Sequence, residues 1–343
     1  MLPDGRRLGA HLPLGMGMVR AVERAHAIGA DAIQIFADNP TAWRRRAAPP
    51  VEQPAFRRRL DVLDIHPVAI HAAYLVNLAG PDPDFFERSV AVLANDLSTA
   101  PAYRARFVNV HIGSHRGSGV EVGTARVAEG VDRVMARVPA STDGAMLVLE
   151  NSAGGGFGLG ATVDEIAAIA EALEKAGVPR DRVGFCLDTA HAWGAGHDLS
   201  DPGATDRLLG AFAARIGIDR LVMIHLNDSK SELGSHTDRH EHVGAGEIGE
   251  IGMAHILRHP LLRHVTYYLE TPGMDEGYDA INITRAYDLA AGRPLAPLPP
   301  GAMTLRGSRA RTAPAEDEQP PPSVGAPSVG APSVRATKRR VRG

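Results

Sequence analysis

Apolar residues gather in eight short runs along the chain, and segments with the helical spacing of apolar positions lie between them. The helical segments include Met18–Ile28, Phe86–Thr99, Val163–Lys175 and Ala204–Ile216. Short runs that are apolar on both faces and alternate with helices are typical of a parallel sheet covered by helices. The eight predicted strands are Arg7–Leu12, Asp31–Phe36, Pro67–Ala72, Arg106–Ile112, Ala145–Glu150, Arg182–Asp188, Arg220–Leu226 and Val265–Glu270.

This alternation fits either an open doubly wound sheet or a closed α/β barrel, and the polar residues decide between them. Each of the last six runs has a metal-capable side chain at its end or one residue before it. In a (β/α)₈ TIM barrel the carboxyl ends of all strands converge on one face, whereas in an open sheet they would be spread along an edge. We therefore predict a barrel in which these six side chains form one ring. They are His71, His111, Glu150, Asp188, His225 and Glu270.

Three further candidate ligands lie in the connections. His191 follows Asp188 by three residues, about one turn if a helix begins there, and Asp238 and His240 share a face if their segment is extended. The nine candidates are five His, two Asp and two Glu. Imidazole and carboxylate ligands without cysteine suit Zn²⁺, Mn²⁺ or Fe²⁺, and zinc suits hydrolysis best. At three or four ligands per ion, with a carboxylate shared, the set is sufficient for three ions.

The charge of the chain bears on the kind of substrate. The net charge is −3, but residues from Gly301 onward carry +5, so residues 1–300 carry −8. An acidic body alone would repel a polyanion. Three divalent ions against four ligand carboxylates would instead make the pocket about +2, which suits phosphoryl chemistry.

Composition separates a C-terminal tail from the barrel. Leu298–Gly343 is rich in Pro, Ala, Ser and Gly and ends in the basic segment Lys338–Arg342, so we expect residues 298–343 to be disordered and residues 1–297 to form the barrel domain. The basic end either adds weak affinity for DNA or has no specific role. The single cysteine, Cys186, excludes an internal disulfide, and no run has the length of a membrane span. We expect a cytoplasmic monomer that does not bind membranes.

Together these residues resemble the endonuclease IV family of metal-dependent apurinic/apyrimidinic (AP) endonucleases, within the xylose-isomerase-like barrels. All nine candidate ligands match the family's ligand positions by residue type, and the similarity extends over about residues 7–290. The matching segments are Gly9–His11, His71–Leu78, Asn109–His115, Leu149–Gly154, Cys186–His191, Gly196–Leu199, His225–Lys230, Asp238–His240, Gly244–Gly249 and Leu269–Thr271.

The resemblance implies a grouping of the ligands around three zinc ions. His71 and His111 would hold the first ion and share Glu150 with a second, which also takes Asp188, His225 and Glu270; His191, Asp238 and His240 would hold the third. A hydroxide between the first two ions would attack the phosphorus, and the third ion would stabilise the leaving 3′-oxygen. The products would be a 3′-hydroxyl and a 5′-deoxyribose phosphate, formed 5′ to an abasic site in duplex DNA during base excision repair.

The same resemblance implies the catalytic and DNA-binding residues. Glu150, Glu270 and His191 would be catalytic, and Arg239 would meet a phosphate. Tyr74 and Leu75 match a loop that enters the duplex, where an abasic nucleotide is flipped out, and Asn39 would also contact DNA. Packing of Tyr74 and Leu75 against the barrel is the alternative for those two residues.

Two features leave alternatives open. The loop Asp38–Arg46 departs from the family, with Asp38 and Thr41 where basic residues are common; Arg44–Arg46 either take over backbone contacts or begin a solvated helix. The competing function is a metal-dependent sugar isomerase or epimerase of the related barrels. Those enzymes resemble the chain only at Glu150, Asp188, His225 and Glu270, so the other five candidates favour the nuclease.

Overall fold

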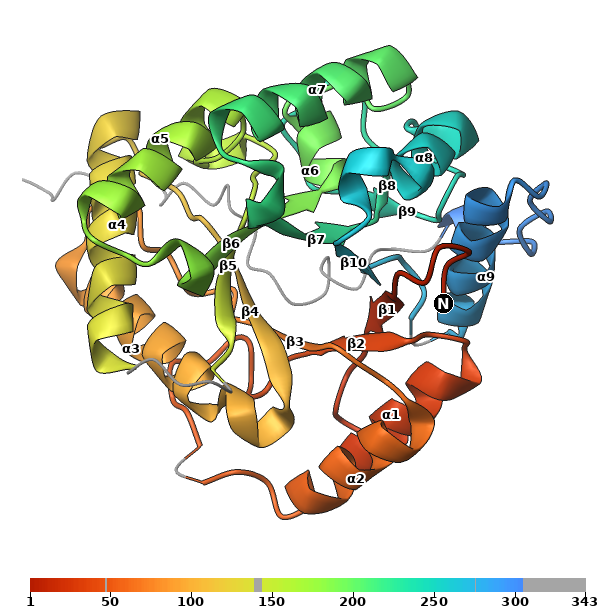
Figure 1. Ribbon diagram of the computed structural model, residues 1–343, viewed down its shortest axis with the longest axis horizontal. Coiled ribbons are helices and arrows are strands. Elements are labelled where there is room, and N and C mark those ends of the chain that lie inside the picture. Colours follow the sequence, from red (N-terminus) through yellow and green to blue (C-terminus); the bar gives the residue numbers. More distant parts are fainter. Residues whose placement is uncertain (47, 139–143, 275, 305–343) are drawn as a thin grey trace, which may run out of the picture. The chain divides into compact units, whose positions relative to one another are not determined.

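Eight parallel strands close into a barrel in the computed structural model, which describes residues 1–46, 48–138, 144–274 and 276–304. The first and last strands, β1 and β10, pair directly, with Ala10 opposite Leu269, and this pairing closes the ring (Figure 1). The predicted (β/α)₈ barrel is confirmed, and the open sheet is excluded. The barrel strands are β1 (Leu8–His11), β2 (Ala32–Ile35), β3 (Val68–His71), β4 (Ala105–His111), β5 (Met146–Glu150), β6 (Val183–Asp188), β7 (Leu221–His225) and β10 (Thr266–Leu269).

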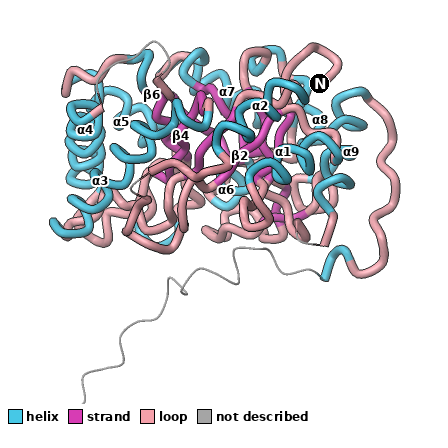
Figure 2. Tube along the Cα trace, turned by 90° about the horizontal axis from the view of Figure 1, so that it is seen from below, coloured by secondary structure: helices cyan, strands magenta, loops and turns pink. Residues whose placement is uncertain are grey.

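Helices surround the strands on the outside of the barrel, as the side view shows (Figure 2). Helix α1 illustrates why: Met18, Ala21, Val22 and Ala25 are buried and lie on one face at helical spacing. The helices are α1 (Met18–Ala27), α2 (Gln53–Leu63), α3 (Pro83–Thr99), α4 (Val120–Arg137), α5 (Val163–Lys175), α6 (Thr189–Gly194), α7 (Pro202–Arg215), α8 (Gly249–Arg258) and α9 (Tyr278–Ala291), with 3₁₀ turns at Ala100–Tyr103, Gly155–Phe157, Arg180–Arg182, Ile218–Arg220, Pro260–Leu262 and Ala302–Thr304.

Two local features extend or supplement the predicted elements. Helix α3 begins at Pro83, three residues before the predicted start, because the Asp82 carboxylate accepts the N–H groups of Asp84 and Phe85 and caps the helix. After β7 the chain forms a short antiparallel hairpin of β8 (Asp228–Ser229) and β9 (His240–Glu241), in which Ser229 pairs with His240. The hairpin brings His240 back beside the strand ends.

The barrel interior contains two layers of side chains, two residues apart on each strand. Successive side chains of a strand alternate between its faces, so positions two apart both point inward. One layer, here called the apolar layer, is a buried cluster made of Ala32, Ala69, Phe107, Val148, Cys186, Met223 and Tyr268. The second, here called the polar layer, lies two residues further along the same segments and consists of Gln34, His71, Asn109, Glu150, Asp188, His225 and Glu270, all of them buried.

Strand β1 follows the same spacing with Gly9 and His11. A Cβ atom at Gly9 would lie 2.6 Å from the carbonyl oxygen of Ala32, so only glycine allows β1 to approach β2 this closely. His11 is buried and joins the polar layer, where its Nδ1 lies 2.9 Å from Glu270 Oε1. The polar layer therefore has one member from each of seven strands and Glu270 directly after the eighth, β10.

The described chain continues beyond Leu298, where we expected the tail to begin. Ala302 is buried, and its carbonyl oxygen accepts a hydrogen bond from His242 Nε2 at 3.2 Å. Residues 305–343, which include the basic segment Lys338–Arg342, lie outside the described residues. Within the described residues, no helix combines the length and the apolar character needed to cross a membrane.

Candidate metal centre

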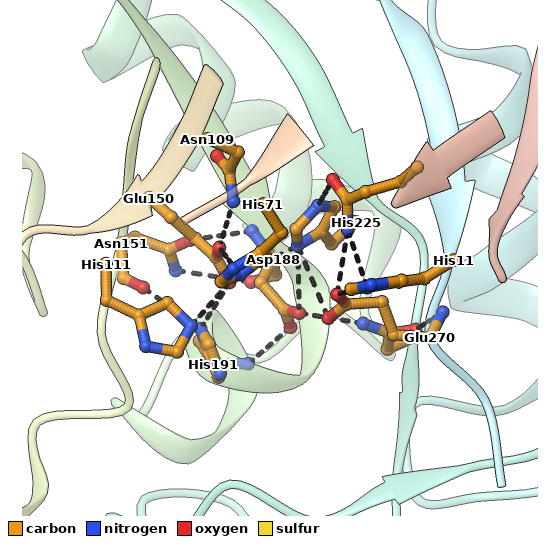
Figure 3. A network of polar contacts seen from close by, with 12 residues as sticks. His11, His71, Asn109, His111, Glu150, Asn151, Asp188, His191, His225 and Glu270 are labelled. Atoms are coloured by element: carbon orange, nitrogen blue, oxygen red, sulfur yellow. Dashed lines mark hydrogen bonds and ion pairs between the residues drawn. The ribbon is translucent and has the colours of Figure 1, made fainter. Parts of the chain in front are cut away.

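Eight of the nine predicted ligands fall into three groups at the carboxyl ends of the strands (Figure 3). In each group, one ligand atom from every member lies within 4.8 Å of those of the others. The first group is His71, His111 and Glu150. His71 Nε2 lies 3.5 Å from Glu150 Oε2, and His111 Nε2 lies 3.5 Å from Glu150 Oε1. The His111 side chain is 35% exposed, so this group opens toward solvent.

The second, inner group is Glu150, Asp188, His225 and Glu270, and all four are buried. His225 Nδ1 lies 3.3 Å from Glu150 Oε1, 3.5 Å from Glu270 Oε2 and 3.8 Å from Asp188 Oδ2. Because Glu150 belongs to both groups, two ions bound there would share one carboxylate, as the resemblance implied.

The third, outer group contains Asp188, His191 and His240. Asp238, the ninth predicted ligand, lies beside them: its carboxylate oxygens are 3.2 Å from His191 Nε2 and 2.8 Å from His240 Nε2. Asp188 Oδ2 is 3.6 Å from His240 Nε2, so this carboxylate lies between the inner and outer groups. The resemblance implied that Asp188 would bind the inner ion alone, whereas the structure places it next to both groups.

Local structure explains how the loop residues reach the outer group. The Asp188 carboxylate caps α6 by accepting the His191 N–H at 2.9 Å, which places His191 one helical turn beyond the strand end. The pairing of β8 with β9 places His240, and Asp238 precedes it by two residues. A helix does begin directly after Asp188, which was the condition for His191 to lie one turn beyond it.

Main-chain carbonyl groups fix the orientation of three ligand imidazoles. The Nδ1 atoms of His71, His191 and His240 lie 2.8, 3.0 and 2.8 Å from the carbonyl oxygens of Ala72, Asn151 and Glu270. A carbonyl oxygen can only accept, so each Nδ1 carries the hydrogen and each Nε2 presents its lone pair to the centre.

Neutral amide side chains contact each carboxylate of the polar layer. Asn109 Nδ2 donates to Glu150 Oε2 at 2.5 Å, Asn227 Nδ2 donates to Asp188 Oδ2 at 2.7 Å, and Gln34 Nε2 donates to Glu270 Oε1 at 2.9 Å. Such contacts orient a metal ligand without adding a competing positive charge. These amides and His11 were not predicted as parts of the centre. The sequence did contain a signal for two of them, because the polar residues Gln34 and Asn109 interrupt apolar strands.

The electrostatics of the centre favour a bound cation. Burial alone would raise the pKa of Glu150, but His225 and His111 hold that pKa well below its usual value. Burial alone would lower the pKa of His225, but Glu270 and Glu150 raise it to about 9. The carboxylates thus hold positive charge on the imidazoles when nothing else supplies it.

Several ligand atoms also have the chemistry that a divalent metal requires. His71 Nε2, His225 Nδ1 and Glu150 Oε1 are buried and have no hydrogen-bond partner among the residues that the structure describes. Buried polar atoms are normally satisfied, so three such atoms on facing ligands are best explained as donors to metal ions. The residues therefore fit metals of the zinc type, with imidazole and carboxylate donors and no thiolate.

One further group of possible ligands does not have these properties. Asp206, His255 and His259 come together where α7 faces α8, with Asp206 Oδ1 2.6 Å from His255 Nε2 and 3.1 Å from His259 Nε2. His259 Nδ1 accepts the Leu261 N–H, so its Nε2 carries the hydrogen and donates it to Asp206. This cluster is a hydrogen-bonded link between two helices.

The residues expected to contact DNA lie in loops beside the centre. The Tyr74 N–H donates to the carbonyl oxygen of Pro40 at 3.1 Å, which links the loop of Tyr74 and Leu75 to the loop of Asn39. The Tyr74 and His71 rings are 6.0 Å apart, centre to centre. Asn39 and Arg239 are exposed, and Arg239 lies between the ligands Asp238 and His240.

The loop Asp38–Arg46, whose contacts with DNA were left open, is held together by its own residues. Asp38 Oδ2 accepts the Arg46 N–H at 2.7 Å, and the Arg45 guanidinium donates to the carbonyl oxygens of Asn39 and Ala42. No helix begins there, so the solvated-helix alternative is wrong. Arg44 is exposed.

Comparisons with known proteins agree with this geometry. The family model "Xylose isomerase-like TIM barrel" matches residues 22–290. The chain is 40% identical to "Probable endonuclease 4" of Methanoculleus marisnigri over 283 residues, which cover 82% of this chain and 98% of that protein. The crystal structure of endonuclease IV from Thermus thermophilus has a TM-score of 0.72 and 36% identity, covering 83% of this chain and 99% of that one.

A more distant solved structure defines the limits of the likeness. D-psicose 3-epimerase from Clostridium cellulolyticum has a TM-score of 0.56 at 15% identity, covering 83% of this chain and 97% of that one, and so shares the fold alone. The matches to endonuclease 4 proteins, by contrast, extend over nearly their whole length at more than a third of positions. The chain therefore belongs to the endonuclease IV family of the xylose isomerase-like TIM barrels.

Proposed function

We propose that this protein is a zinc-dependent AP endonuclease that cleaves the phosphodiester bond 5′ to an abasic site in duplex DNA. The products would be a 3′-hydroxyl and a 5′-deoxyribose phosphate, as in base excision repair. One observation supports the proposal most strongly: three adjacent groups of residues that could each hold a metal ion lie at one end of the barrel, in a chain that belongs to the endonuclease IV family. We further propose that it acts as a cytoplasmic monomer.

Each group of residues would have a separate task in holding the metals. His71 and His111 would bind the first ion, and His225 and Glu270 the inner ion, with Glu150 shared between them. His191, Asp238 and His240 would bind the outer ion, with Asp188 between the inner and outer positions. Zn²⁺ bound in this way would supply Lewis-acid polarisation of the phosphate and a lower pKa for attacking water; Mn²⁺ or Fe²⁺ could replace it at some positions.

The protein residues would control charge and position around the reacting phosphate. Glu150, Glu270 and His191 would be the catalytic ligands, and between them they represent all three groups. The four ligand carboxylates would leave the pocket with a net charge of about +2 when three ions are bound, which attracts a phosphodiester despite the acidic body. Arg239 projects from between two ligands and would meet a neighbouring phosphate.

Loop residues would provide selectivity for damaged duplex. Tyr74 and Leu75 would enter the helix next to the metal centre, and Asn39 would contact the strand from the adjoining loop. Flipping a nucleotide out of the stack costs least where its base is already missing. The hydrogen bond from Tyr74 to Pro40 would make these two loops act as one unit.

The sugar isomerase or epimerase alternative uses only part of the centre. It accounts for Glu150, Asp188, His225 and Glu270, which hold one or two metals. It gives no role to the first group's His71 and His111 or to the outer group's His191, Asp238 and His240. The presence of all five beside the inner group favours the nuclease.

The deciding experiment is incision of a duplex with one synthetic abasic site, together with metal analysis of the same preparation. We expect cleavage on the 5′ side, about three zinc ions per chain, and no comparable cleavage of the undamaged duplex. Metal-loaded protein that leaves the abasic duplex intact but converts a ketose or aldose would contradict the proposal.

A further inference from the structure

The Gln34 side chain has only one possible orientation. It is fully buried, and its two amide atoms each face a predicted ligand of the inner group: Nε2 is 2.9 Å from Glu270 Oε1, and Oε1 is 3.0 Å from His225 Nε2. A carboxylate can only accept, so the amide nitrogen must face Glu270. The amide oxygen therefore faces His225, and His225 Nε2 must carry the hydrogen.

This orientation determines which nitrogen of His225 can bind a metal. In the neutral ring that a metal ligand requires, a hydrogen on Nε2 leaves the lone pair on Nδ1, which points toward Glu150, Glu270 and Asp188 at 3.3 to 3.8 Å. On the opposite side of the amide, donation to Oε1 of Glu270 turns Oε2 toward the same Nδ1 atom. Two ligands from different strands are thus directed at one point by one side chain.

His225 differs in this respect from three other ligand imidazoles. His71, His191 and His240 donate from Nδ1 to main-chain carbonyl groups and present Nε2 to the centre. His225 donates from Nε2 to a side chain and presents Nδ1. The orientation of three rings is therefore fixed by the backbone, whereas that of His225 depends on a residue that can be replaced.

We propose that Gln34 is a positioning residue for the inner metal ion, selecting the His225 tautomer and orienting Glu270. The inference rests on the proposed metal centre. Without the amide, the His225 ring loses the acceptor that holds a hydrogen on Nε2, and the ring is no longer held with Nδ1 facing the carboxylates. Glu270 keeps its contact with His11 Nδ1 at 2.9 Å, so the loss of orientation is expected mainly at His225. The first and outer groups keep all of their ligands.

Metal titration of a Gln34→Leu variant tests this role. Apoprotein is titrated with Zn²⁺ against a chromophoric chelator, and the cobalt-substituted protein is examined by visible absorption. We expect the affinity for one ion to fall by about tenfold to a hundredfold, which is usual for loss of such a partner. The affinities for the other ions stay unchanged, and the absorption of only one cobalt ion changes.

Asn282→Leu is the matched control. Asn282 is also fully buried, and its amide contacts both an imidazole, His242 Nδ1 at 3.0 Å, and the Val243 N–H at 3.0 Å. His242 belongs to none of the three groups, so Asn282→Leu lowers stability without changing metal affinity. Gln34→Asn keeps the amide but shortens its reach, and it is expected to fold and to show an intermediate loss at the same ion.

Each outcome has a definite meaning. Wild-type affinities in Gln34→Leu, or equal metal loss in Gln34→Leu and Asn282→Leu, would overturn the positioning role. If Gln34→Leu does not fold, unchanged affinity in Gln34→Asn overturns it in the same way. Wild-type protein that binds no zinc would instead refute the metal centre, and zinc-loaded protein without incision would refute the nuclease alone.

Discussion

The apolar and polar layers of the barrel lie on the same strands, two residues apart, and have opposite chemistry. On β5, for example, Val148 packs in the apolar layer and Glu150 joins two ligand groups in the polar layer. The apolar layer offers only packing, so its replacement should affect stability. The polar layer buries charge that packing alone would disfavour, so its replacement should affect metals and catalysis. The residues that pack the barrel and the residues proposed to bind metals thus lie only two positions apart on the same strands.

The largest expected effect is that of Glu150→Gln in the polar layer. The change removes the carboxylate shared by the first and inner groups while keeping the size of the side chain. We expect two of the bound ions to be lost and abasic-site cleavage to fall by roughly four orders of magnitude or more. Metal analysis, single-turnover incision and thermal melting measure this. A folded, metal-depleted variant that cleaves at the wild-type rate would contradict it.

Phe107→Ala in the apolar layer should show the reverse pattern. Phe107 is 2% exposed, and its truncation leaves a cavity two residues before Asn109. We expect the free energy of unfolding to fall by about 3–5 kcal/mol, while the metal content at low temperature stays that of the wild type. Denaturant unfolding with metal analysis on the same sample checks both parts. Selective loss of the metals with full stability would show that the layers are not separable.

Metal removal should make the polar layer a source of pH dependence. In the apoprotein the pKa of His225 is raised from 6.5 to about 9, so the proton stabilises the folded state. This contribution is fully present below pH 6.5 and is lost as pH rises through 9. Melting temperatures of the apoprotein should fall across that window, and those of the zinc-loaded protein should change less. A flat or rising apoprotein profile would argue against the assignment.

The smallest effect is expected outside the barrel, at Asp206→Asn. This change weakens the link from α7 to His255 and His259, and because Asp206 is exposed and solvent screens its contacts, the melting temperature should fall only slightly. The number and affinity of bound metals should not change. Loss of an ion in this variant would show that the cluster of Asp206, His255 and His259 binds a metal, as the polar layer is proposed to do.

Most of the barrel could be predicted from the sequence because its apolar strands end in carboxylate or imidazole side chains that an apolar segment does not need in order to fold. Glu150 and His225 close their runs in this way, and period-two spacing places them inside. Gln34 and His11 were not predicted as parts of the centre because their roles depend on contacts with Glu270, which is distant in the sequence. The sharing of Asp188 between two groups likewise depends on distances that spacing does not determine.

Short and capped elements were the other source of error. The hairpin of β8 and β9 has two residues in each strand, too few to produce a periodic signal. The early start of α3 depends on Asp82, a cap that lies outside the apolar pattern. The loop Asp38–Arg46 is ordered by hydrogen bonds among its own polar groups, which composition does not reveal.

The apolar layer also fills the barrel interior on one side of the predicted ligands. Tyr268 and Phe107 fill the barrel beneath the predicted ligands. Cys186 lies in the same layer, and burial raises the pKa of its thiol well above the usual value, which favours the neutral form. Metal ions and substrate would then reach the predicted ligands from the carboxyl ends of the strands, where the His111 side chain is 35% exposed. A DNA duplex bound over the carboxyl ends of the strands would cover the bound ions. A chelator would therefore strip the ions more slowly from the complex than from the free protein.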